Sequence, residues 1–337
     1  MDHSGSTLKT ARVIAQHRGK YRVGCDNVEF WATVTGRTIF TAESQLDYPV
    51  VGDMVNIVVV GNDSAVIKEI FPRKSILERK ASGKDAVQPI AANVDTVFIV
   101  QAIDRDFNLN RFERYVTIIR AGNILPVLVL NKIDLISPEE LKEKIAQVND
   151  RLKDVPLLTT STLTENGIDS LIQEVKKGQI YSFLGSSGVG KSSLINKLLG
   201  HALLRTEEIS AQTNKGKHTT THRELYELKN GAMVIDNPGM REVGLADVVV
   251  GVNSVFAEIE YLGRDCKFRN CSHQSEPECA VLAAVRSGDL SESKYENYLK
   301  LKKESEYFAM TKLEKRNKDR GFGQMLKVYK KLKKKLK

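Results

Sequence analysis

The stretch "QIYSFLGSSGVGKSSLINKLLG", residues 179–200, decides the fold. It reads as an apolar strand, a glycine-rich turn and a helix that ends at Gly200. The turn, Gly185 to Ser192, matches G-x-x-x-x-G-K-[ST], a pattern whose backbone N–H groups close around phosphates at the start of a helix. Lys191 would reach the β and γ phosphates, and Ser192 would hold Mg²⁺. A glycine-rich turn without a ligand is the alternative, and the flanking strand and helix count against it.

Residues from Asn93 onward alternate between apolar strands and helical stretches. "VDTVFIV" precedes a helix near 111–121, and "LPVLVL" precedes "SPEELKEKIAQVNDRL"; later strands are "VPLLT", "QIYSFLG" and "AMVID". The helix after "LPVLVL" has Ser137 as its N-cap, Pro138 in its first turn and Glu140 completing a capping box. Continuous apolar strands between amphipathic helices predict a parallel sheet that is covered on both faces.

Polar motifs follow these strands where open α/β sheets bind their ligands, at the carboxyl ends. "NKID", Asn131 to Asp134, follows "LPVLVL", and Ser161-Thr162 follows "VPLLTT". A carboxylate at Asp134 can accept hydrogen bonds from N1–H and the N2 amino group of guanine, which adenine does not offer. The motifs therefore favour GTP over ATP.

The next motif is "DNPG", in which Asp236 would contact Mg²⁺ through water and the amide of Gly239 would sense the γ-phosphate. The loop before it, "NKGKHTTTHREL", is the place for a switch threonine. Thr219, Thr220 and Thr221 all remain candidates; Thr220 is taken as the working choice. In isolation, "DNPG" could be a β-turn and "HTTT" a polar loop. In this order, the motifs are those of a GTPase whose sequence is circularly permuted.

Three of the four cysteines gather in "CKFRNCSHQSEPEC". Cys266, Cys271, His273 and Cys279 make a closed set of three thiolates and one imidazole, which suits a structural Zn²⁺ with no open position for catalysis. Reduced cysteines beside an unrelated histidine are the alternative. Cys25 stands apart and is expected to be a small buried hydrophobe.

The N-terminal part, residues 8–70, alternates apolar and polar residues in short bursts separated by Gly, Asp and Asn. This pattern predicts a small antiparallel β domain, and it is compatible with an OB-type barrel, whose face binds oligonucleotides. Residues 72–92 are polar, basic and turn-rich, and are expected to form a linker or a mobile loop.

Charge is unevenly distributed along the chain. The net charge is +9, while residues 301–337 hold 14 Lys or Arg against four Asp or Glu. A basic tail on a near-neutral body suggests a polyanionic partner, although a solvated tail is an equal alternative. Its apolar residues recur at helical spacing, so a membrane surface, a partner helix or RNA could receive it.

Composition and termini point to a cytoplasmic, reducing compartment. Apolar residues make up 41% and charged residues 28% of the chain, and no apolar run reaches the ~18 residues that a membrane span requires. The N-terminus lacks the apolar core of a signal peptide, and four cysteines in 337 residues do not make a disulfide framework.

With these motifs in place, the sequence resembles the ribosome small subunit-dependent GTPase A (RsgA) family of bacteria. The resemblance covers nearly the whole chain. Its marks are "YPVVGD", "RKSILERK", "IAANVDTVFIV", "NKID", "GSSGVGKSSLIN", "KGKHTTTHREL", "DNPGMRE" and the cysteine loop.

The resemblance implies a multidomain protein that assists late maturation of the 30S subunit. Its parts would be an N-terminal OB-type β-barrel (1–71), a linker (72–92), a central circularly permuted α/β P-loop GTPase domain (93–248) and a C-terminal, mainly helical zinc-binding domain (249–337). GTP hydrolysis to GDP and phosphate would require Mg²⁺ and would be stimulated by the small subunit.

Residue by residue, the motifs and the positions that they share with the family imply three sets of contacts. Nucleotide contacts are expected at Asn131, Lys132, Ile133, Asp134, Ser161, Thr162, Gly185, Ser186, Ser187, Gly188, Val189, Gly190, Lys191, Ser192 and Ser193. Catalytic roles are expected for Lys191, Ser192, Asp236 and Gly239, with His218 and Thr220 as hypotheses. Metal ligands are expected at Cys266, Cys271, His273 and Cys279 for zinc and at Ser192 for magnesium.

The chain departs from the family pattern at Asn237 and at Thr162, and both changes should be tolerated. Met240 stands where many GTPases place a glutamine that orients the attacking water, and a thioether cannot do this. Intrinsic hydrolysis should therefore be slow. His218 is the hypothesis for that role, with a surface histidine as an equal alternative.

The resulting hypothesis is a release timer: a GTP-bound monomer docks on the 30S subunit and its 16S rRNA, without a membrane, and hydrolysis releases it. One rival is a plain RNA-binding protein with a vestigial nucleotide site. A second is a translation factor or a large-subunit assembly GTPase. Intact Lys191, Ser192, Asp134 and Asp236 argue against the first rival.

Overall fold

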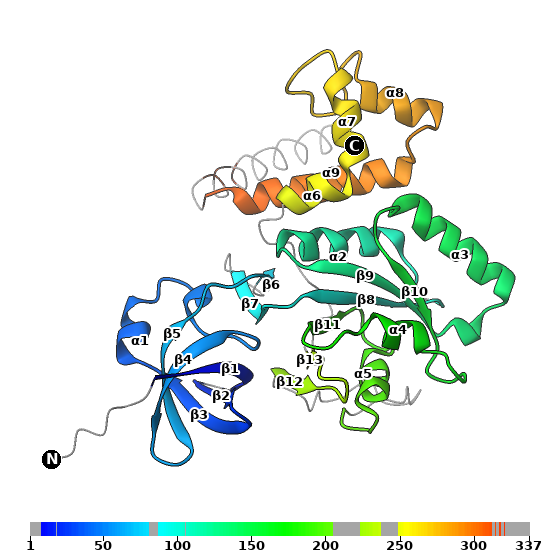
Figure 1. The fold of residues 1–337 in the computed structure, drawn as a ribbon. Coiled ribbons are helices and arrows are strands. Elements are labelled where there is room, and N and C mark those ends of the chain that lie inside the picture. The colour runs from blue at the N-terminus through cyan, green and yellow to red at the C-terminus, as the bar shows by residue number, and fades with distance from the viewer. Residues whose placement is uncertain are drawn as a thin grey trace, which may run out of the picture.

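The computed structural model describes residues 8–17, 19–80, 87–104, 106–204, 223–236 and 249–311, with 314, 317 and 320. The first of these residues form a closed barrel of five strands (Figure 1). β1 (Leu8–His17) pairs antiparallel with both β2 (Lys20–Cys25) and β4 (Met54–Val60). β3 (Val28–Val34) pairs antiparallel with β2 and parallel with β5 (Ser64–Ile70), which returns to β4. This closure confirms the predicted OB-type barrel.

Alternation along the barrel strands has the expected consequence. In β2, every second residue is buried, and these side chains join those of the other strands in one interior cluster that includes Val23, Val55 and Ile57. Asp26 and Asn27 make the turn between β2 and β3 with φ of 52° and 63°, which a two-residue hairpin of this type requires. α1 (Gly36–Thr41) and η1 (Gln45–Asp47) occupy the connection from β3 to β4.

The expectation of a linker or mobile loop over 72–92 is wrong for most of its residues. β6 (Ile76–Lys80) and β7 (Val87–Ala92) form an antiparallel pair. The physical reason is burial: Leu77 and Ile90 are fully buried and belong to the largest apolar cluster among the described residues. The basic composition around them obscured two short apolar strands.

The central sheet has the strand order β10-β9-β8-β11-β13-β12. Its strands are β8 (Thr96–Ala102), β9 (Leu125–Asn131), β10 (Leu157–Thr160), β11 (Ile180–Leu184), β12 (Arg223–Glu227) and β13 (Met233–Asp236). All neighbours are parallel except β12, which runs antiparallel to β13. The prediction of a parallel sheet is thus confirmed for five of these strands.

Both faces of this sheet are covered, because alternate residues of one strand enter different clusters. Val97 of β8 belongs to one cluster and Phe98 to the other. α2 (Leu109–Ala121) and α3 (Pro138–Arg151) contribute to the first cluster, while α4 (Asp169–Glu174) and α5 (Lys191–Leu199) contribute to the second. The capping box at the start of α3 is present as predicted.

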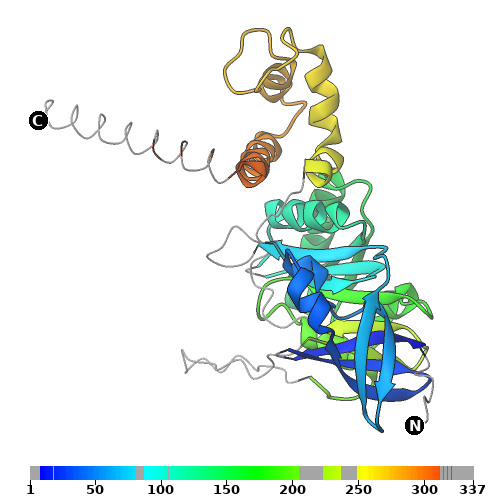
Figure 2. The same cartoon turned by 90° about the vertical axis from the view of Figure 1, so that its left-hand side faces the viewer.

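The C-terminal helices continue the first cluster rather than building a separate core. These elements are α6 (Val249–Val255), α7 (Ala257–Leu262), η3 (Gly263–Asp265), α8 (Ala280–Ser287) and α9 (Glu292–Ala309). Phe256 and Tyr298, both fully buried, lie in the same cluster as Phe112 of α2. Figures 1 and 2 show these helices and the barrel on opposite sides of the α/β region. None of the described helices is both long and apolar enough to cross a bilayer.

A buried ion pair joins three helices across this contact. Nε and Nη2 of Arg151 donate to the two carboxylate oxygens of Glu113 at 2.8 and 2.6 Å, and the Glu113 side chain is fully buried. Nδ2 of Asn297, from α9, donates to the same carboxylate at 2.6 Å. α2, α3 and α9 therefore share one buried polar contact.

Arg151→Met should destabilise the protein strongly, because it leaves the buried Glu113 carboxylate without its counter-charge. We expect a loss of about 3–5 kcal/mol in the free energy of unfolding, measured by urea denaturation followed by circular dichroism. Arg120→Met is the matched control, since its partner Asp154 is 70% exposed and such pairs contribute about 0–1 kcal/mol. Equal losses in the two variants would contradict this account.

Candidate functional site

The predicted phosphate loop lies between β11 and α5, with its glycines in conformations that other residues avoid. Gly185 has φ +148°, and a Cβ there would lie 2.1 Å from the carbonyl oxygen of Val100 on β8. Gly188 and Gly190 have φ of +82° and +100°. α5 begins at Lys191, so the loop leads directly into the positive end of a helix, the arrangement that binds phosphate.

Lys191 folds back over this loop. Its Nζ donates to the carbonyl oxygens of Gly185 and Ser186 at 2.8 and 2.6 Å. The ammonium group is thereby held at the centre of the loop, where anions would be received. Ser192 and Ser193 follow in the first turn of α5.

Asn131, at the end of β9, connects the predicted base-reading loop to the phosphate loop. Its Nδ2 donates to the carbonyl oxygen of Val189 at 2.8 Å, and its Oδ1 accepts from the hydroxyl of Thr160 at 2.9 Å. The side chain is almost completely buried. The end of β9, the end of β10 and the phosphate loop are thus joined through one amide group.

Asp134 is held by the serine that follows β10. Oγ of Ser161 donates to Oδ1 of Asp134 at 2.5 Å and accepts from the backbone N–H of Leu163 at 3.1 Å. Lys132 adopts a left-handed conformation with φ 63°, which turns the chain sharply after β9. Asp134 itself is exposed, so its carboxylate is accessible to a ligand. The segment after β9 that contains Asp134 and the segment after β10 that begins with Ser161 therefore lie in contact, at the carboxyl ends of neighbouring strands.

Asp236 ends β13 and lies opposite Glu224 of β12. Glu224 also accepts from Nη2 of Arg22 in the barrel at 2.5 Å and from the hydroxyl of Tyr226 at 3.1 Å. Burial, followed by the charge of Glu224, raises the pKa of Tyr226, while burial lowers the pKa of Arg223 to about 10. His218, Thr219, Thr220, Thr221 and Gly239 lie outside the described residues.

The structure adds a contact that the sequence analysis missed. Nη1 of Arg111, in the first turn of α2, donates to Oγ of Ser186 at 2.9 Å and also pairs with Asp106. The signal was available, because the segment after β8 also follows the carboxyl end of a strand of this sheet. The residues after β8 match none of the nucleotide-binding motifs, so the sequence predicted only a helix there.

The four predicted zinc ligands come together. Their donor atoms all lie within 4.8 Å of one another. Sγ of Cys266 lies 3.7 Å from Sγ of Cys279 and 3.6 Å from Nδ1 of His273, and Sγ of Cys279 lies 3.5 Å from the same nitrogen. Zinc bonds of usual length in a tetrahedron imply S···S of about 3.8 Å and S···N of about 3.5 Å. The set therefore fits a tetrahedral metal ion.

The loop between these ligands is shaped by local contacts. The carboxylate of Glu276 accepts hydrogen bonds from the backbone N–H groups of Ser272, Gln274 and Ser275. Hydrogen bonds, first of all those from Ser272, hold the pKa of Glu276 well below its usual range. Tyr295 of α9 donates to the carbonyl oxygen of His273 at 2.6 Å, which secures the loop to the helices.

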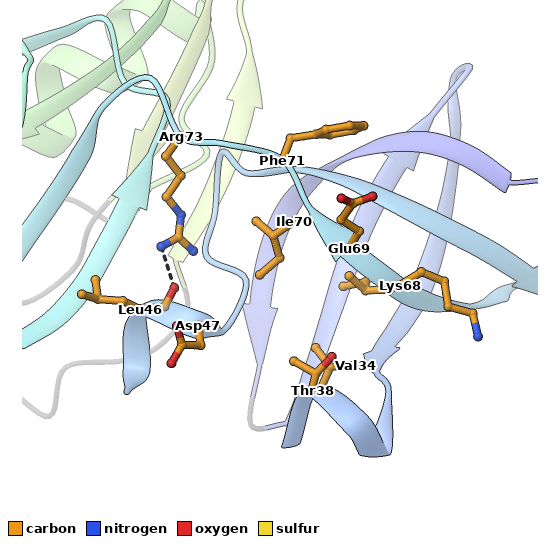
Figure 3. A pocket seen from close by; sticks show the side chains of 10 residues that line it. Val34, Thr38, Leu46, Asp47, Lys68, Glu69, Ile70, Phe71 and Arg73 are labelled. Atoms are coloured by element: carbon orange, nitrogen blue, oxygen red, sulfur yellow. Dashed lines mark hydrogen bonds between the residues drawn. The ribbon is translucent and has the colours of Figure 1, made fainter. Parts of the chain in front are cut away.

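A separate cavity of about 420 Å³ opens in the barrel (Figure 3). One wall is fixed by Arg73, whose Nη1 donates to the carbonyl oxygen of Leu46 at 2.7 Å. The cavity contains none of the residues predicted to bind nucleotide or metal. Its lining is Val34, Thr38, Leu46, Asp47, Ile67, Lys68, Glu69, Ile70, Phe71 and Arg73.

Gly190→Ala should destabilise the protein more than Gly188→Ala. Both positions have positive φ, which costs an alanine roughly 1–2 kcal/mol. Only at Gly190 would the new Cβ also meet a neighbour, Nδ2 of Asn131 at 2.3 Å, whereas nothing lies within 4 Å at Gly188. Urea denaturation of the two variants measures the difference, and equal losses would show that the Asn131 contact tolerates displacement.

Comparison with known proteins agrees with this geometry. The "RsgA GTPase" family profile matches residues 70–246, and a second profile, described as "50S ribosome-binding GTPase", matches residues 181–312. A protein of Lactiplantibacillus plantarum named "Small ribosomal subunit biogenesis GTPase RsgA 2" is 44% identical over 297 residues, covering 88% of this chain and 83% of that protein.

Two solved structures share the fold. The crystal structure of YjeQ from Thermotoga maritima has a TM-score of 0.65 and 26% identity, covering 89% of this chain and 99% of that one. YloQ, described as a circularly permuted GTPase, has a TM-score of 0.63 and 22% identity, covering 92% of this chain and 99% of that one. With its phosphate loop, permuted motif order and Cys₃His cluster, the chain belongs to the RsgA GTPase family.

Proposed function

We propose that this protein binds GTP, hydrolyses it to GDP and phosphate, and acts in the biogenesis of the small ribosomal subunit. The observation that carries the proposal is the junction at Asn131, which brings the base-reading loop against the phosphate loop. The contacts of Asp134 with Ser161 and of Asn131 with Val189 are both present. This intact arrangement argues against a vestigial nucleotide site. Family membership supports the same activity.

Within this proposal, the base and the phosphates are bound from two sides. The carboxylate of Asp134 would accept hydrogen bonds from guanine, and a backbone amide near Thr162 would read the guanine oxygen. The loop from Gly185 to Ser193 would surround the phosphates. Lys191 would leave the loop carbonyls and place its ammonium group on the β and γ phosphate oxygens.

Hydrolysis requires stabilisation of the charge on the γ-phosphate and an ordered water molecule. Lys191 and the loop N–H groups would provide the first. Mg²⁺, held through the hydroxyl of Ser192 and approached by Asp236, would neutralise phosphate charge when bound. Gly239, Thr220 and His218 remain proposals from the sequence: a γ-phosphate sensor, a switch residue and a water-positioning residue.

The partner is proposed from the names of the relatives together with charge. Proteins of 40–44% identity carry the name "Small ribosomal subunit biogenesis GTPase", and the basic tail suits a polyanion such as 16S rRNA. The protein would dock as a monomer in the cytoplasm, through its barrel, C-terminal helices and tail. GTP hydrolysis would then time its release during late 30S maturation.

One observation favours a second candidate, the large subunit. The profile described as "50S ribosome-binding GTPase" matches residues 181–312, which include the phosphate loop and the cysteine cluster. This match covers less of the chain than the full-length relatives do. The large subunit is therefore the rival that the functional test must exclude.

The domain division is proposed as barrel 1–71, GTPase domain 93–248 and zinc-binding helical domain 249–337, with the β6–β7 hairpin of residues 72–92 packed on the core of the GTPase domain. The Cys₃His cluster supports the last of these, because its donor distances suit zinc. Zinc there would be structural, since four protein ligands leave no position for a substrate.

Steady-state GTP hydrolysis should rise at least about tenfold when purified small subunits are added. Met240 stands where many GTPases have the glutamine that orients the attacking water, so a docked partner would have to help to position that water. The measurement compares the protein alone, with small subunits and with large subunits at matched concentrations. Lys191→Ala is the control for contaminating activity. Stimulation by large subunits alone would favour the second candidate, and none by either would support an RNA-binding protein.

The same assay tests His218. If it positions the water, His218→Ala should keep GTP affinity and lose most of the stimulated turnover. Unchanged stimulated turnover would remove His218 from the mechanism.

The purified protein should contain one equivalent of zinc, measured by elemental analysis. Cys279→Ser should lose it, because Cys279 belongs to the four-ligand set and a serine hydroxyl does not replace a thiolate ligand of zinc. Loss of the metal should lower the thermal stability of the C-terminal helices, where binding and folding are linked. Cys25→Ser, at a cysteine in the barrel core, is the control. Full zinc content in Cys279→Ser would refute the assigned ligand set.

A further inference from the structure

The segment between β8 and α2 reaches the phosphate loop through one side chain. Nη1 of Arg111 donates to Oγ of Ser186 at 2.9 Å. The same nitrogen pairs with the carboxylate of Asp106 and donates to its backbone carbonyl oxygen at 3.3 Å. Arg111 therefore connects the start of α2 to the second residue of the phosphate loop.

The position of Arg111 is set by contacts of its own segment. The backbone N–H of Arg111 donates to Oδ1 of Asn108, the N-cap of α2, at 3.0 Å. Gln101 is fully buried, and its side-chain amide donates to and accepts from the backbone of Asn108 at 3.0 and 2.7 Å. A buried side chain of β8 thus holds the helix start, and the helix start directs the guanidinium group.

This arrangement is not the one that helix stability alone would favour. A cation in the first turn of a helix opposes the positive end of the helix dipole, and α2 has no acidic residue in its first turn. Within the described residues, Oδ2 of Asp106 is one of few buried side-chain oxygens without a hydrogen-bond partner. The cation at the helix start and the unpartnered oxygen of Asp106 both cost stability. Their position at the edge of the expected ligand site indicates a function.

We propose that Arg111 is a positioning residue for the phosphate end of the nucleotide, acting through the hydroxyl of Ser186. The inference rests on the proposed function, in which this loop binds guanine nucleotides. Ser186 is held twice here: Arg111 binds its hydroxyl, and Lys191 binds its carbonyl oxygen at 2.6 Å.

The two contacts differ in what happens when a nucleotide binds. Lys191 must turn its ammonium group toward the phosphates, which removes its contact with the loop carbonyls. The contact from Arg111 then remains and keeps the loop in the shape that aims its N–H groups at the phosphates. Arg111 would thereby preorganise the site without touching the γ-phosphate, so GDP and GTP should depend on it equally.

Dissociation constants of a fluorescent GDP and of a non-hydrolysable GTP analogue, measured with the full chain, test this. Arg111→Met and Ser186→Ala should each weaken both ligands by about tenfold, the value of one charge-assisted hydrogen bond. The double variant should be no weaker than either single variant, because both remove the same contact. Arg111→Lys, which keeps a charged donor, should recover most of the affinity.

Arg120→Met is the matched control, since Arg120 lies at the other end of α2 and pairs with Asp154 and Ser254. Its affinities should equal those of the unmodified protein. Multiplying effects in the double variant, or loss of the GTP analogue alone, would overturn the inference. If Arg111→Met fails to fold, Arg111→Gln replaces it in the same comparison with Ser186→Ala and the double variant, because Ser186 is itself an expected nucleotide contact and cannot decide alone. An unmodified protein that binds neither ligand would instead refute the proposed function.

Discussion

The side-chain amide of Asn131 is the contact on which the nucleotide site depends. It donates to the phosphate loop at Val189 and accepts from Thr160 at the end of β10. Three segments that are distant in the sequence are therefore fixed to one another by a single buried group. The geometry of this junction is indifferent to the order in which the chain supplies its segments, and this explains how a GTPase site survives circular permutation.

α2 connects the nucleotide site to the C-terminal helices. Its first turn contacts the phosphate loop through Arg111, and Glu113, two residues later, is buried against Arg151 and Asn297. Because the apolar cluster also runs without a break from α2 to α9, any movement at the start of α2 is opposed by packing along its length. The Cys₃His cluster is secured to the same α9 by Tyr295.

The barrel contacts the α/β region at two places. Val51, just before β4, accepts a hydrogen bond from the backbone N–H of Ala92 at 2.9 Å and belongs to the same apolar cluster as Leu77 and Ile90. β1 pairs with β12 at only two positions, Ala15 with Glu224 and Gln16 with Arg223. β12 in turn lies beside β13, which ends at Asp236. β12 thus lies between the barrel and β13, and the ion pair of Arg22 with Glu224 strengthens that connection.

Much of the fold was predictable because its signals are local. Apolar runs, the capping box at Ser137, the glycines of the phosphate loop and the spacing of the Cys₃His set each act within a few residues, so the sequence alone determined the barrel, the sheet, the motif order and the ligand cluster. Only the tertiary structure decided the β6–β7 hairpin, the common core of GTPase and C-terminal helices, and the contact of Arg111 with Ser186. The shared core and the Arg111 contact depend on burial and pairing between residues far apart in the chain, which no local pattern encodes. The hairpin is local in its pairing, but its apolar residues are buried against that same distant core.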